Sequence, residues 1–349
     1  MKKMTIRENL NISNKCLIIA EVAQAHDGSL GMAHAYIDAI ADSGVDAVKF
    51  QTHIAAAEST IEEPWRVKFS MQDKTRYDYW KRMEFTQEQW YGLKKHAIEK
   101  GLLFISSPFS LEAVELLNKI GGVDAWKIAS GEVNNYLLLK RIIEQERPIL
   151  LSSGMSPLFE IDKAIDTIRN KNIPFAVMQC TSTYPTKPED VGHNLLLEFR
   201  KRYNSDIGLS DHSGCIYPGL AAAVVGADVL EVHVVFSKKM FGPDVTSSLD
   251  ISELTQLVKG VRFIEKMISN PIDKDKMADK LTPMRNLFTK SIVTRVPLNS
   301  GVILKKDDLT LKKPGTGIPF EQIHNLIGRK LIHSVPADYI ISENDLEKR

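Results

Sequence analysis

Residues 16–22 read CLIIAEV, a short apolar run that carries a glutamate near its end. Between this run and those that follow lie segments whose apolar residues have helical spacing, such as 30–43, 111–119 and 161–170. Strand and helix that alternate eight times predict a closed parallel barrel, the TIM (β/α)₈ fold. The seven further runs are AVKFQTH (47–53), LFISSPF (103–109), AWKIAS (125–130), PILLSSG (148–154), FAVMQCT (175–181), DIGLSDH (206–212) and VLEVHVVF (229–236).

Polar or charged side chains end each run, and their placement locates the site. In a parallel barrel the carboxyl ends of all strands meet at one mouth, where enzymes of this architecture carry out their chemistry. Random placement would scatter such side chains over both ends of the strands. The residues predicted to gather at the mouth are Glu21, His26, Lys49, Gln51, Ser107, Lys127, Ser130, Ser153, Thr181, Ser210, Asp211, His212, Glu231 and His233.

The chain has 349 residues, whereas a barrel needs roughly 250. We expect the barrel to occupy residues 1–270, with a last helix over 252–268. Residues 271–286 are polar and predict a linker. Residues 287–349 carry short β-branched runs such as SIVTRV (291–296), which predict a small β-rich domain.

Composition excludes several kinds of partner. The formal net charge is only +1 and no block of Lys and Arg stands out, so neither nucleic acid nor an anionic membrane is expected. Cys16, Cys180 and Cys215 are odd in number and far apart, which favours reduced thiols. The sequence shows no signal peptide and no apolar run of about 20 residues. We therefore expect a soluble cytoplasmic protein.

One connection, from Ile54 to Phe85, is unusually long and shows no regular run. Its tryptophans and tyrosines argue against disorder, and its root lies on the mouth side of the barrel. Long loops in compact domains commonly serve as lids or binding loops. We expect this connection to form a wall of the active site or a subunit contact.

Two histidines suggest a metal site. His212 and His233 end runs that become neighbours in a closed barrel, where both imidazoles can meet one cation at about 2.1 Å. Two histidines with oxygen partners suit Mn²⁺, Fe²⁺, Co²⁺ or Zn²⁺, with substrate and water completing the coordination. Alternatively, a neighbouring carboxylate, Asp211 or Glu231, satisfies each histidine. Spacing alone leaves both interpretations open.

Two lysines lie inside apolar strands, Lys49 in AVKFQ and Lys127 in AWKIAS. Burying an ammonium group costs several kcal/mol unless it is paired. These lysines therefore form a cradle for phosphate and carboxylate, form a Schiff base, or pair internally with Glu21 or Glu231. The two glutamates are candidates for a general base or for support of the metal ligands. The turn FGPDV (241–245) would place Asp244 over the mouth, although a plain turn explains it equally well.

Together these motifs resemble the sialic acid synthase family, which comprises N-acetylneuraminate synthase and its legionaminate and pseudaminate relatives. The resemblance runs from about residue 16 to residue 346. The motifs are IIAEVAQAHDGS (18–29), AVKFQTH, FISSPFS (104–110), WKIASGEVNN (126–135), LSSGMS (151–156), QCTSTYPT (179–186), GLSDHS (208–213), LEVHVVF (230–236) with GPD (242–244), and KKPGTGIP (312–319).

The resemblance implies a fold, an assembly and a reaction. The fold is a metal-dependent barrel followed by a β-rich antifreeze-like (SAF, β-clip) domain. The assembly is a domain-swapped homodimer in which that domain covers the partner's active site. The reaction condenses phosphoenolpyruvate with open-chain N-acetylmannosamine and water, giving N-acetylneuraminate and phosphate. The implied cofactor is a divalent metal, Mn²⁺ in the first place, with Mg²⁺ or Co²⁺ as alternatives.

The resemblance also assigns roles residue by residue. His212 and His233 match the metal ligands and, with Glu21 and Glu231, the catalytic group. The positions that match the family's phosphoenolpyruvate site are Lys49, Ser107, Lys127, Ser130, Ser153 and Ser210. The positions that match the amino-sugar side are Glu21, Gln51, Tyr184, Asp244 and Lys313.

The chain departs from the family pattern at three positions. Ala25 replaces the usual Asn before His26, Val232 replaces the usual Arg between Glu231 and His233, and Lys313 replaces the usual Arg before Pro-Gly. Lysine lacks the bidentate fork of arginine, so recognition of the sugar's acyl group is expected to differ. These changes put the identity of the sugar in doubt.

Three alternatives remain. The first is a legionaminate- or pseudaminate-type synthase that uses a 2,4-diacetamido-6-deoxy hexose. The second is a Schiff-base aldolase with Lys127 or Lys49 as the nucleophile, which the histidines and serines do not favour. The third is a carbohydrate- or ice-binding role for the tail, but residues 287–349 show no regular threonine array.

Overall fold

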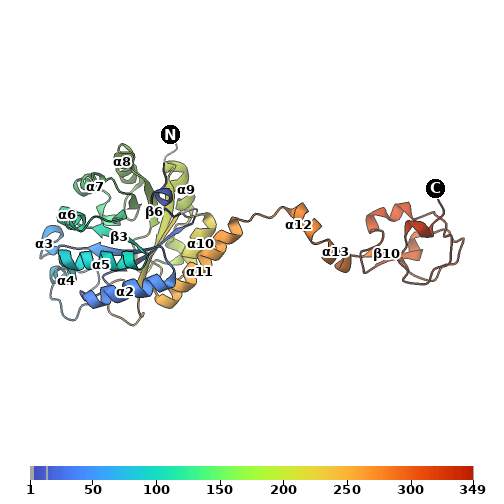
Figure 1. Ribbon diagram of the computed structural model, residues 1–349, viewed down its shortest axis with the longest axis horizontal. Helices are drawn as coiled ribbons and strands as arrows, with labels where there is room; N and C mark the ends of the chain where they lie inside the picture. Colours follow the sequence, from blue (N-terminus) through green and yellow to red (C-terminus); the bar gives the residue numbers. More distant parts are fainter. Residues whose placement is uncertain (1–3, 13–14, 349) are drawn as a thin grey trace. The chain divides into compact units, whose positions relative to one another are not determined.

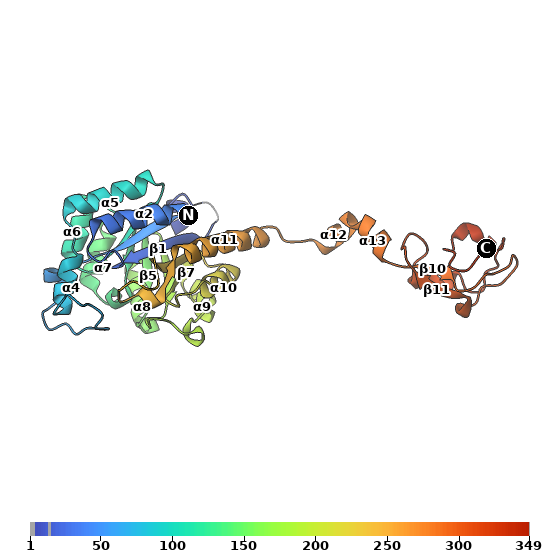
Figure 2. The same ribbon diagram turned by 90° about the horizontal axis from the view of Figure 1, so that it is seen from below.

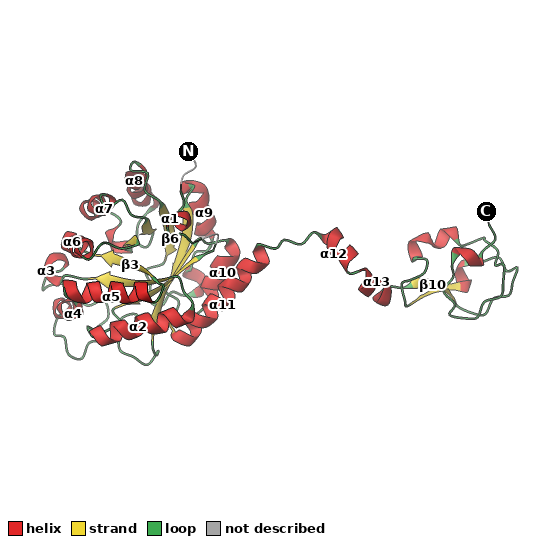
Figure 3. Ribbon diagram, viewed as in Figure 1, coloured by secondary structure: helices red, strands yellow, loops and turns green. Residues whose placement is uncertain are grey.

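The computed structural model describes residues 4–12 and 15–348. The chain divides between Ser269 and Asn270 into two compact units, each described by itself below. Helices surround the strands in the first unit, and the second is built mainly of loops and short elements (Figures 1 and 3).

The first unit is a closed barrel of eight parallel strands, which confirms the predicted fold. Neighbouring strands pair in chain order, and β1 pairs with β8 to close the ring, with Glu21 opposite His233. A short strand β9 (Ser248–Asp250) pairs in parallel with the carboxyl end of β8, from His233 to Val235. The barrel strands are β1 (Leu17–Ala23), β2 (Ala47–Thr52), β3 (Leu103–Pro108), β4 (Ala125–Ile128), β5 (Ile149–Ser152), β6 (Phe175–Cys180), β7 (Asp206–Asp211) and β8 (Val229–Val235).

Helices follow the strands and cover the outside of the barrel. The predicted helix over 30–43 is α2, which begins after the N-cap Ser29 and ends at Gly44 in the left-handed conformation that glycine adopts freely. Helix α11 packs against α2 and α10, as the turned view shows (Figure 2). The helices are α1 (Ile6–Asn9), α2 (Leu30–Ser43), α3 (Ala55–Glu58), α4 (Arg76–Met83), α5 (Gln87–Glu99), α6 (Leu111–Lys119), α7 (Tyr136–Ile143), α8 (Leu158–Arg169), α9 (Asn194–Tyr203), α10 (Tyr217–Val225) and α11 (Ile251–Ile268).

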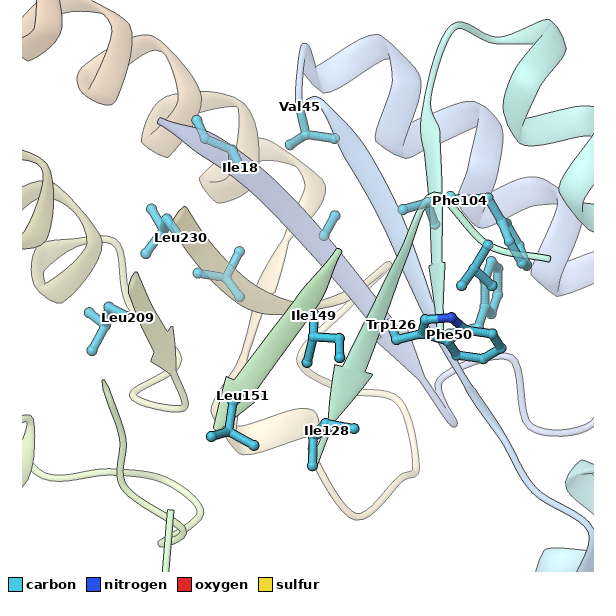
Figure 4. Close-up of a cluster of buried hydrophobic side chains, with 14 of the residues drawn as sticks. Ile18, Val45, Phe50, Phe104, Trp126, Ile128, Ile149, Leu151, Leu209 and Leu230 are labelled. Atoms are coloured by element: carbon cyan, nitrogen blue, oxygen red, sulfur yellow. The ribbon is translucent and has the colours of Figure 1, made fainter. Parts of the chain in front are cut away.

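Two apolar layers hold the barrel together. The outer layer lies between strands and helices and includes Ile18, Phe50, Phe104 and Trp126 (Figure 4). The inner layer fills the barrel and includes Leu17, Ile19, Ala47, Ala125, Leu150 and Val229. Ile6 of α1 belongs to this inner layer and is fully buried. The inside of the barrel is therefore a packed core at the amino ends of the strands.

The alternation of side chains along each strand builds the site above this inner core. On β1, Leu17 and Ile19 belong to the inner layer, and Glu21 is the next residue on the same face. On β8, Val229 precedes Glu231 and His233 in the same way. The inward face of each strand thus changes from apolar at the amino end to polar at the carboxyl end.

The expectation that residues 54–85 contain no regular structure was wrong. Helices α3 and α4 lie within this connection. Thr75 caps α4 in a reciprocal capping box with Asp78. Tyr79 and Trp80 of α4 form a buried cluster with Ala55 and Met83. Trp65 and Phe69 pack against this cluster. The aromatics predicted to order the connection therefore do so by forming a small core of their own.

The second unit contains α12 (Lys274–Lys280), α13 (Thr282–Phe288) and an antiparallel pair, β10 (Ser291–Thr294) and β11 (Leu309–Lys312). The two helices fall largely within the segment predicted as a linker. Its core includes Ile292, Leu304, Leu326 and Ile341. Among the described residues, no helix is long and apolar enough to cross a membrane.

Candidate active site

A cavity of about 470 Å³ lies at the carboxyl ends of the barrel strands, and we call it the mouth cavity. Strand ends supply Gln51 and His233, and the loop after β8 supplies Asp244. The long connection supplies Trp65, Arg66, Tyr79 and Trp80 among other residues. The connection that sequence reasoning singled out therefore forms one wall of the cavity.

Four charged side chains form a buried cluster inside the barrel, which we call the Lys–Glu quartet: Glu21, Lys49, Lys127 and Glu231. Each is at most 4% exposed. Lys127 Nζ lies 2.6 Å from both carboxylate oxygens of Glu231. Lys49 Nζ lies 2.7 Å from Glu21 Oε2 and 3.4 Å from Glu231 Oε1. The internal pairing that the sequence left open is thus present.

Hydroxyl groups complete the quartet's surroundings. Lys49 Nζ donates to Ser107 Oγ at 3.3 Å, and Ser210 Oγ donates to Glu231 Oε1 at 3.0 Å. Ser107 and Ser210 therefore lie beside the quartet, Ser107 on Lys49 and Ser210 on Glu231. Of the six residues assigned to phosphoenolpyruvate, Ser130 lines the mouth cavity directly.

The quartet's electrostatics favour the charged forms of Glu231 and Lys49, whereas burial raises the pKa of Glu21. Burial by itself raises the pKa of Glu231, but Lys127 and Lys49 outweigh it and hold the pKa well below its usual range. Burial lowers the pKa of Lys49, but Glu21 and Glu231 outweigh that effect and raise it. For Lys127, burial dominates and lowers the pKa, with Glu231 opposing it. The carboxylate of Glu231 is therefore an acceptor shared by two cations.

Ser130 and Ser153 lie near Cys180. Ser130 Oγ is 3.5 Å from Cys180 Sγ, and Ser153 Oγ accepts the backbone N–H of Cys180 at 3.2 Å. Gly154 permits this packing, since a Cβ there would lie 2.0 Å from Ser130 Oγ. The glycine of the LSSG motif thus makes room for a cavity-lining hydroxyl.

His212 and His233 come together as predicted. Their ring centroids are 5.2 Å apart, and both rings are buried. His212 Nδ1 lies 3.0 Å from the Thr181 carbonyl oxygen, and its Nε2 lies 3.3 Å from the Tyr184 hydroxyl. A proton on Nδ1 that bonds Thr181 leaves the Nε2 lone pair directed toward Tyr184. Burial lowers the pKa of His233 to about 3, so its imidazole is neutral at pH 7.

The two histidines fit a divalent metal whose coordination the protein alone does not complete. A metal-binding histidine commonly donates its second N–H to a backbone carbonyl, as His212 does to Thr181. Within residues 4–12 and 15–348, no group of three or more His, Cys, Asp or Glu residues is arranged to hold a metal ion. Two imidazoles would therefore be the ligands that the protein offers, and substrate or water would supply the others.

The predicted sugar-side residues Gln51, Tyr184 and Asp244 all line the mouth cavity. Arg66 from the long connection ties two of them together. Its Nη2 bonds Asp244 Oδ1 at 2.6 Å, and its guanidinium lies 4.4 Å from the centroid of the Tyr184 ring. Lys313 belongs to the second unit, where its ammonium lies 5.2 Å from the centroid of the Phe288 ring.

The structure explains one of the sequence departures. Val232 packs in the outer layer between strands and helices, so the residue between Glu231 and His233 faces away from the cavity. His26 is buried, with its ring centroid 4.8 Å from that of Phe85, and its Nδ1 accepts the Gly28 N–H. Of the fourteen residues predicted at the mouth, Gln51, Ser130 and His233 line the cavity. The other eleven are not among its lining residues: Glu21, His26, Lys49, Ser107, Lys127, Ser153, Thr181, Ser210, Asp211, His212 and Glu231.

Sequence reasoning missed several lining residues, among them Gln24, His53, Glu58 and Phe109. His53 is the last letter of the quoted run AVKFQTH, so a signal for it existed. Glu58 lies in the connection that was predicted to be irregular, and nothing in its sequence neighbourhood pairs it with His53. Only the packing of the connection against the barrel brings these residues together.

Comparison with known proteins identifies the family. Residues 36–273 match the NeuB family, and residues 289–347 match the SAF domain. The N-acetylneuraminate-9-phosphate synthase of Homo sapiens is 34% identical over 334 residues, which is 94% of this chain and 92% of that protein. The N,N'-diacetyllegionaminic acid synthase of Campylobacter jejuni is 32% identical over 337 residues, 94% of this chain and 99% of that protein.

A solved structure supports the same family assignment. The N-acetylneuraminic acid synthetase of Leptospira borgpetersenii superposes with a TM-score of 0.68 at 28% identity, covering 77% of this chain and 92% of that one. The chain therefore belongs to the NeuB family and is an enzyme of the sialic acid synthase family with a C-terminal SAF domain. This confirms the resemblance drawn from the motifs.

Proposed function

We propose that this enzyme condenses phosphoenolpyruvate with open-chain N-acetylmannosamine and water, giving N-acetylneuraminate and phosphate. The observation that carries the proposal is the Lys–Glu quartet beside two buried imidazoles at one end of the barrel. Phosphoenolpyruvate carries a phosphate and a carboxylate, and both are bound well by ammonium and hydroxyl donors. Lys49, Lys127, Ser107 and Ser210 supply these donors once the glutamates yield them to the ligand.

The proposed chemistry balances without a further reactant. C3 of phosphoenolpyruvate forms a bond to the aldehyde carbon of the sugar, and water adds at C2. The bond between C2 and the phosphate oxygen then breaks, which releases phosphate and leaves a ketone. One proton of the water goes to the former aldehyde oxygen and the other to the phosphate. Glu21 and Glu231 are the proposed carboxylates for taking up and returning such a proton.

The residues of the site contribute mainly by positioning. Lysines that hold phosphate and carboxylate convert an encounter of three components into reaction between fixed partners. A divalent metal, Mn²⁺ with Mg²⁺ or Co²⁺ as alternatives, would be held by His212 and His233. It would supply Lewis-acid polarisation of the aldehyde.

The identity of the sugar separates the proposal from its main alternative. Relatives named for N-acetylneuraminate 9-phosphate, legionaminate and pseudaminate have similar identities of 34%, 32% and 30%. A legionaminate- or pseudaminate-type synthase, which takes a 2,4-diacetamido-6-deoxy hexose, is therefore the second candidate.

A panel of sugars tests the proposal. Purified enzyme with phosphoenolpyruvate and Mn²⁺ is offered N-acetylmannosamine, its 6-phosphate and 2,4-diacetamido-6-deoxy hexoses, and released phosphate is measured. We expect N-acetylmannosamine to give the highest kcat/KM. A higher value with a diacetamido sugar would replace the proposal by the alternative. Borohydride trapping of a pyruvate adduct on Lys49 or Lys127 would instead establish a Schiff-base lyase.

We also propose that the enzyme works as a domain-swapped homodimer in which the SAF domain of one protomer covers the mouth cavity of its partner. Several large apolar side chains at the mouth end of the barrel are exposed. Leu137, Phe159 and Tyr217 lie in the first turns of helices that follow strands, and Phe241 lies in the loop after β8; each is at least 69% exposed. Such a surface favours a protein cover.

Deletion of residues 287–349 tests this assembly. We expect the barrel to remain folded, because its core is separate, and kcat to fall by at least about tenfold because the cavity is no longer closed to water. Steady-state kinetics and sedimentation velocity measure both effects. A truncated monomer with unchanged kcat and sugar KM would refute the swapped cover.

The cytoplasm is the proposed compartment. All three cysteines of the chain are described, and all are free thiols. Free thiols, two of them buried, are typical of proteins that remain in a reducing environment.

A further inference from the structure

His53 is a buried histidine that the proposed reaction does not use. Its ring lies between Trp80 and Phe109, with centroid separations of 4.1 and 4.5 Å and interplanar angles of 19° and 13°. This sandwich fixes the plane of the imidazole but not its tautomer. Hydrogen bonds at the two ring nitrogens must therefore decide which nitrogen carries the proton.

Glu58 decides the tautomer. Its Oε1 lies 2.6 Å from His53 Nδ1, and a carboxylate accepts, so Nδ1 carries the proton. His53 Nε2 lies 2.8 Å from Gln24 Nε2 and 3.2 Å from Gln51 Oε1, and in the neutral ring with its proton on Nδ1 it accepts from the nearer Gln24. The same Gln24 nitrogen donates to Gln51 Oε1 at 2.5 Å, and Gln51 Nε2 donates to Glu21 Oε1 at 2.9 Å. The chain of bonds thus runs from Glu58 to the Lys–Glu quartet.

Carboxylates at both ends of this hydrogen-bond network, Glu58 and Glu21, fix the orientation of the two side-chain amides between them. Gln51 must turn its N–H₂ group toward Glu21, which leaves its carbonyl oxygen to accept from Gln24. Gln24 then donates one N–H to Gln51 and the other to His53. Its Oε1 has no hydrogen bond within the described part of the chain and is what Gln24 presents to a ligand. A proton on His53 Nε2 would face the Gln24 N–H₂ group 2.8 Å away and would compete with it for Gln51 Oε1, 3.2 Å away, so the Gln24 amide would lose one acceptor or both.

The network belongs to the wall of the mouth cavity. Gln24, Gln51, His53 and Glu58 all line it. The Glu58 side chain is 8% exposed, and its Oε2 has no hydrogen-bond partner among the described residues. An unpaired carboxylate oxygen is costly in a purely structural network. A carboxylate that faces a cavity for a hydroxyl-rich ligand can recover that cost from the ligand.

We propose that Glu58 is a positioning residue that acts through His53 to hold Gln24 and Gln51 in the amide orientation that recognises the acceptor sugar. In this orientation Gln24 offers a carbonyl acceptor to a hydroxyl or N–H donor of the sugar. The inference rests on the proposed function, in that the acceptor is an amino sugar. It gives a segment of the long connection a positioning role in sugar recognition.

Three variants and two measurements test the proposal. Glu58→Ala removes the acceptor, Glu58→Gln keeps one, and Glu62→Ala removes an exposed carboxylate from the same connection as a control. We expect Glu58→Ala to raise the sugar KM by about tenfold, the effect of one lost hydrogen bond to a charged group, while the KM for phosphoenolpyruvate stays unchanged. Glu58→Gln and Glu62→Ala are expected to stay close to the wild type.

Long-range ¹H–¹⁵N spectra of ¹⁵N-histidine-labelled protein report the tautomer without any substrate, with His53 assigned by its loss in His53→Gln. We expect the Nδ1–H form in the wild type and in Glu58→Gln, and a mixture of tautomers in Glu58→Ala.

An Nε2–H form in the wild type overturns the proposal, as does an unchanged sugar KM in Glu58→Ala. A parallel rise in both KM values also overturns it, because it indicates general loosening of the site. A wild type inactive with every sugar overturns the proposed function instead, and the spectra still decide the tautomer.

Discussion

His212→Ala is expected to lower kcat by about 10³-fold or more, because losing a Lewis acid from the aldehyde raises the barrier by several kcal/mol. The ring it removes is buried, hydrogen-bonded to the Thr181 carbonyl, and 5.2 Å from His233 between ring centroids. The same substitution is expected to abolish Mn²⁺ binding, measured by electron paramagnetic resonance of the free ion. Chelation of the wild type should reproduce the loss, and added Mn²⁺ should reverse it in the wild type alone.

His193→Ala is a matched control, since the His193 ring bonds the Pro218 carbonyl and not the partners of His212, Thr181 and Tyr184. It should leave Mn²⁺ binding and kcat close to their wild-type values. Full activity of His212→Ala, or of the wild type after exhaustive chelation, would remove the metal from the proposed mechanism.

Lys127→Met is expected to cost about 3–5 kcal/mol of stability, because it leaves Glu231 as a buried charge with a weaker partner. Lys127 Nζ contacts both Glu231 oxygens at 2.6 Å, whereas Lys49 is 3.4 Å away. Activity should disappear as well, since a phosphoenolpyruvate donor is lost. The free energy of unfolding in urea and phosphate release at saturating substrate measure the two effects.

The double variant Lys127→Met/Glu231→Leu separates stability from function. It removes both charges and leaves the Lys49–Glu21 pair intact, so stability should return while activity does not. Lys238→Met breaks an exposed pair with Glu253 and should cost less than about 1 kcal/mol. If the single variant at 127 unfolds no more easily than Lys238→Met, the quartet does not carry the charges assigned to it.

The fold was predictable because its signal is periodic and local. The run 16–22 alternates in a way that places Leu17 and Ile19 in the inner core and Glu21 above them, and this reading needs no knowledge of the other strands. The same alternation explains why Val232 faces the helices while Glu231 and His233 face inward. Adjacent strand ends then bring His212 and His233 together.

The details that sequence reasoning missed depend on contacts between distant segments. The sequence left open whether Lys49 and Lys127 pair with Glu21 and Glu231, since the choice depends on side-chain reach inside the closed barrel. Helix α4 was missed although its capping box, Thr75 with Asp78, is visible in the sequence, because only eight residues follow it. The bond between Glu58 and His53 needs the fold of the connection itself.

The Lys–Glu quartet affects which anions can bind to the enzyme before its substrates do. Its two ammonium ions already have carboxylate partners, so chloride or bicarbonate, abundant in any cell, gains little by entering. An anion that replaces those partners must bring several charges and a spread of acceptor oxygens at once. Selectivity against common salts is thus established before any sugar arrives, by competition from the enzyme's own side chains.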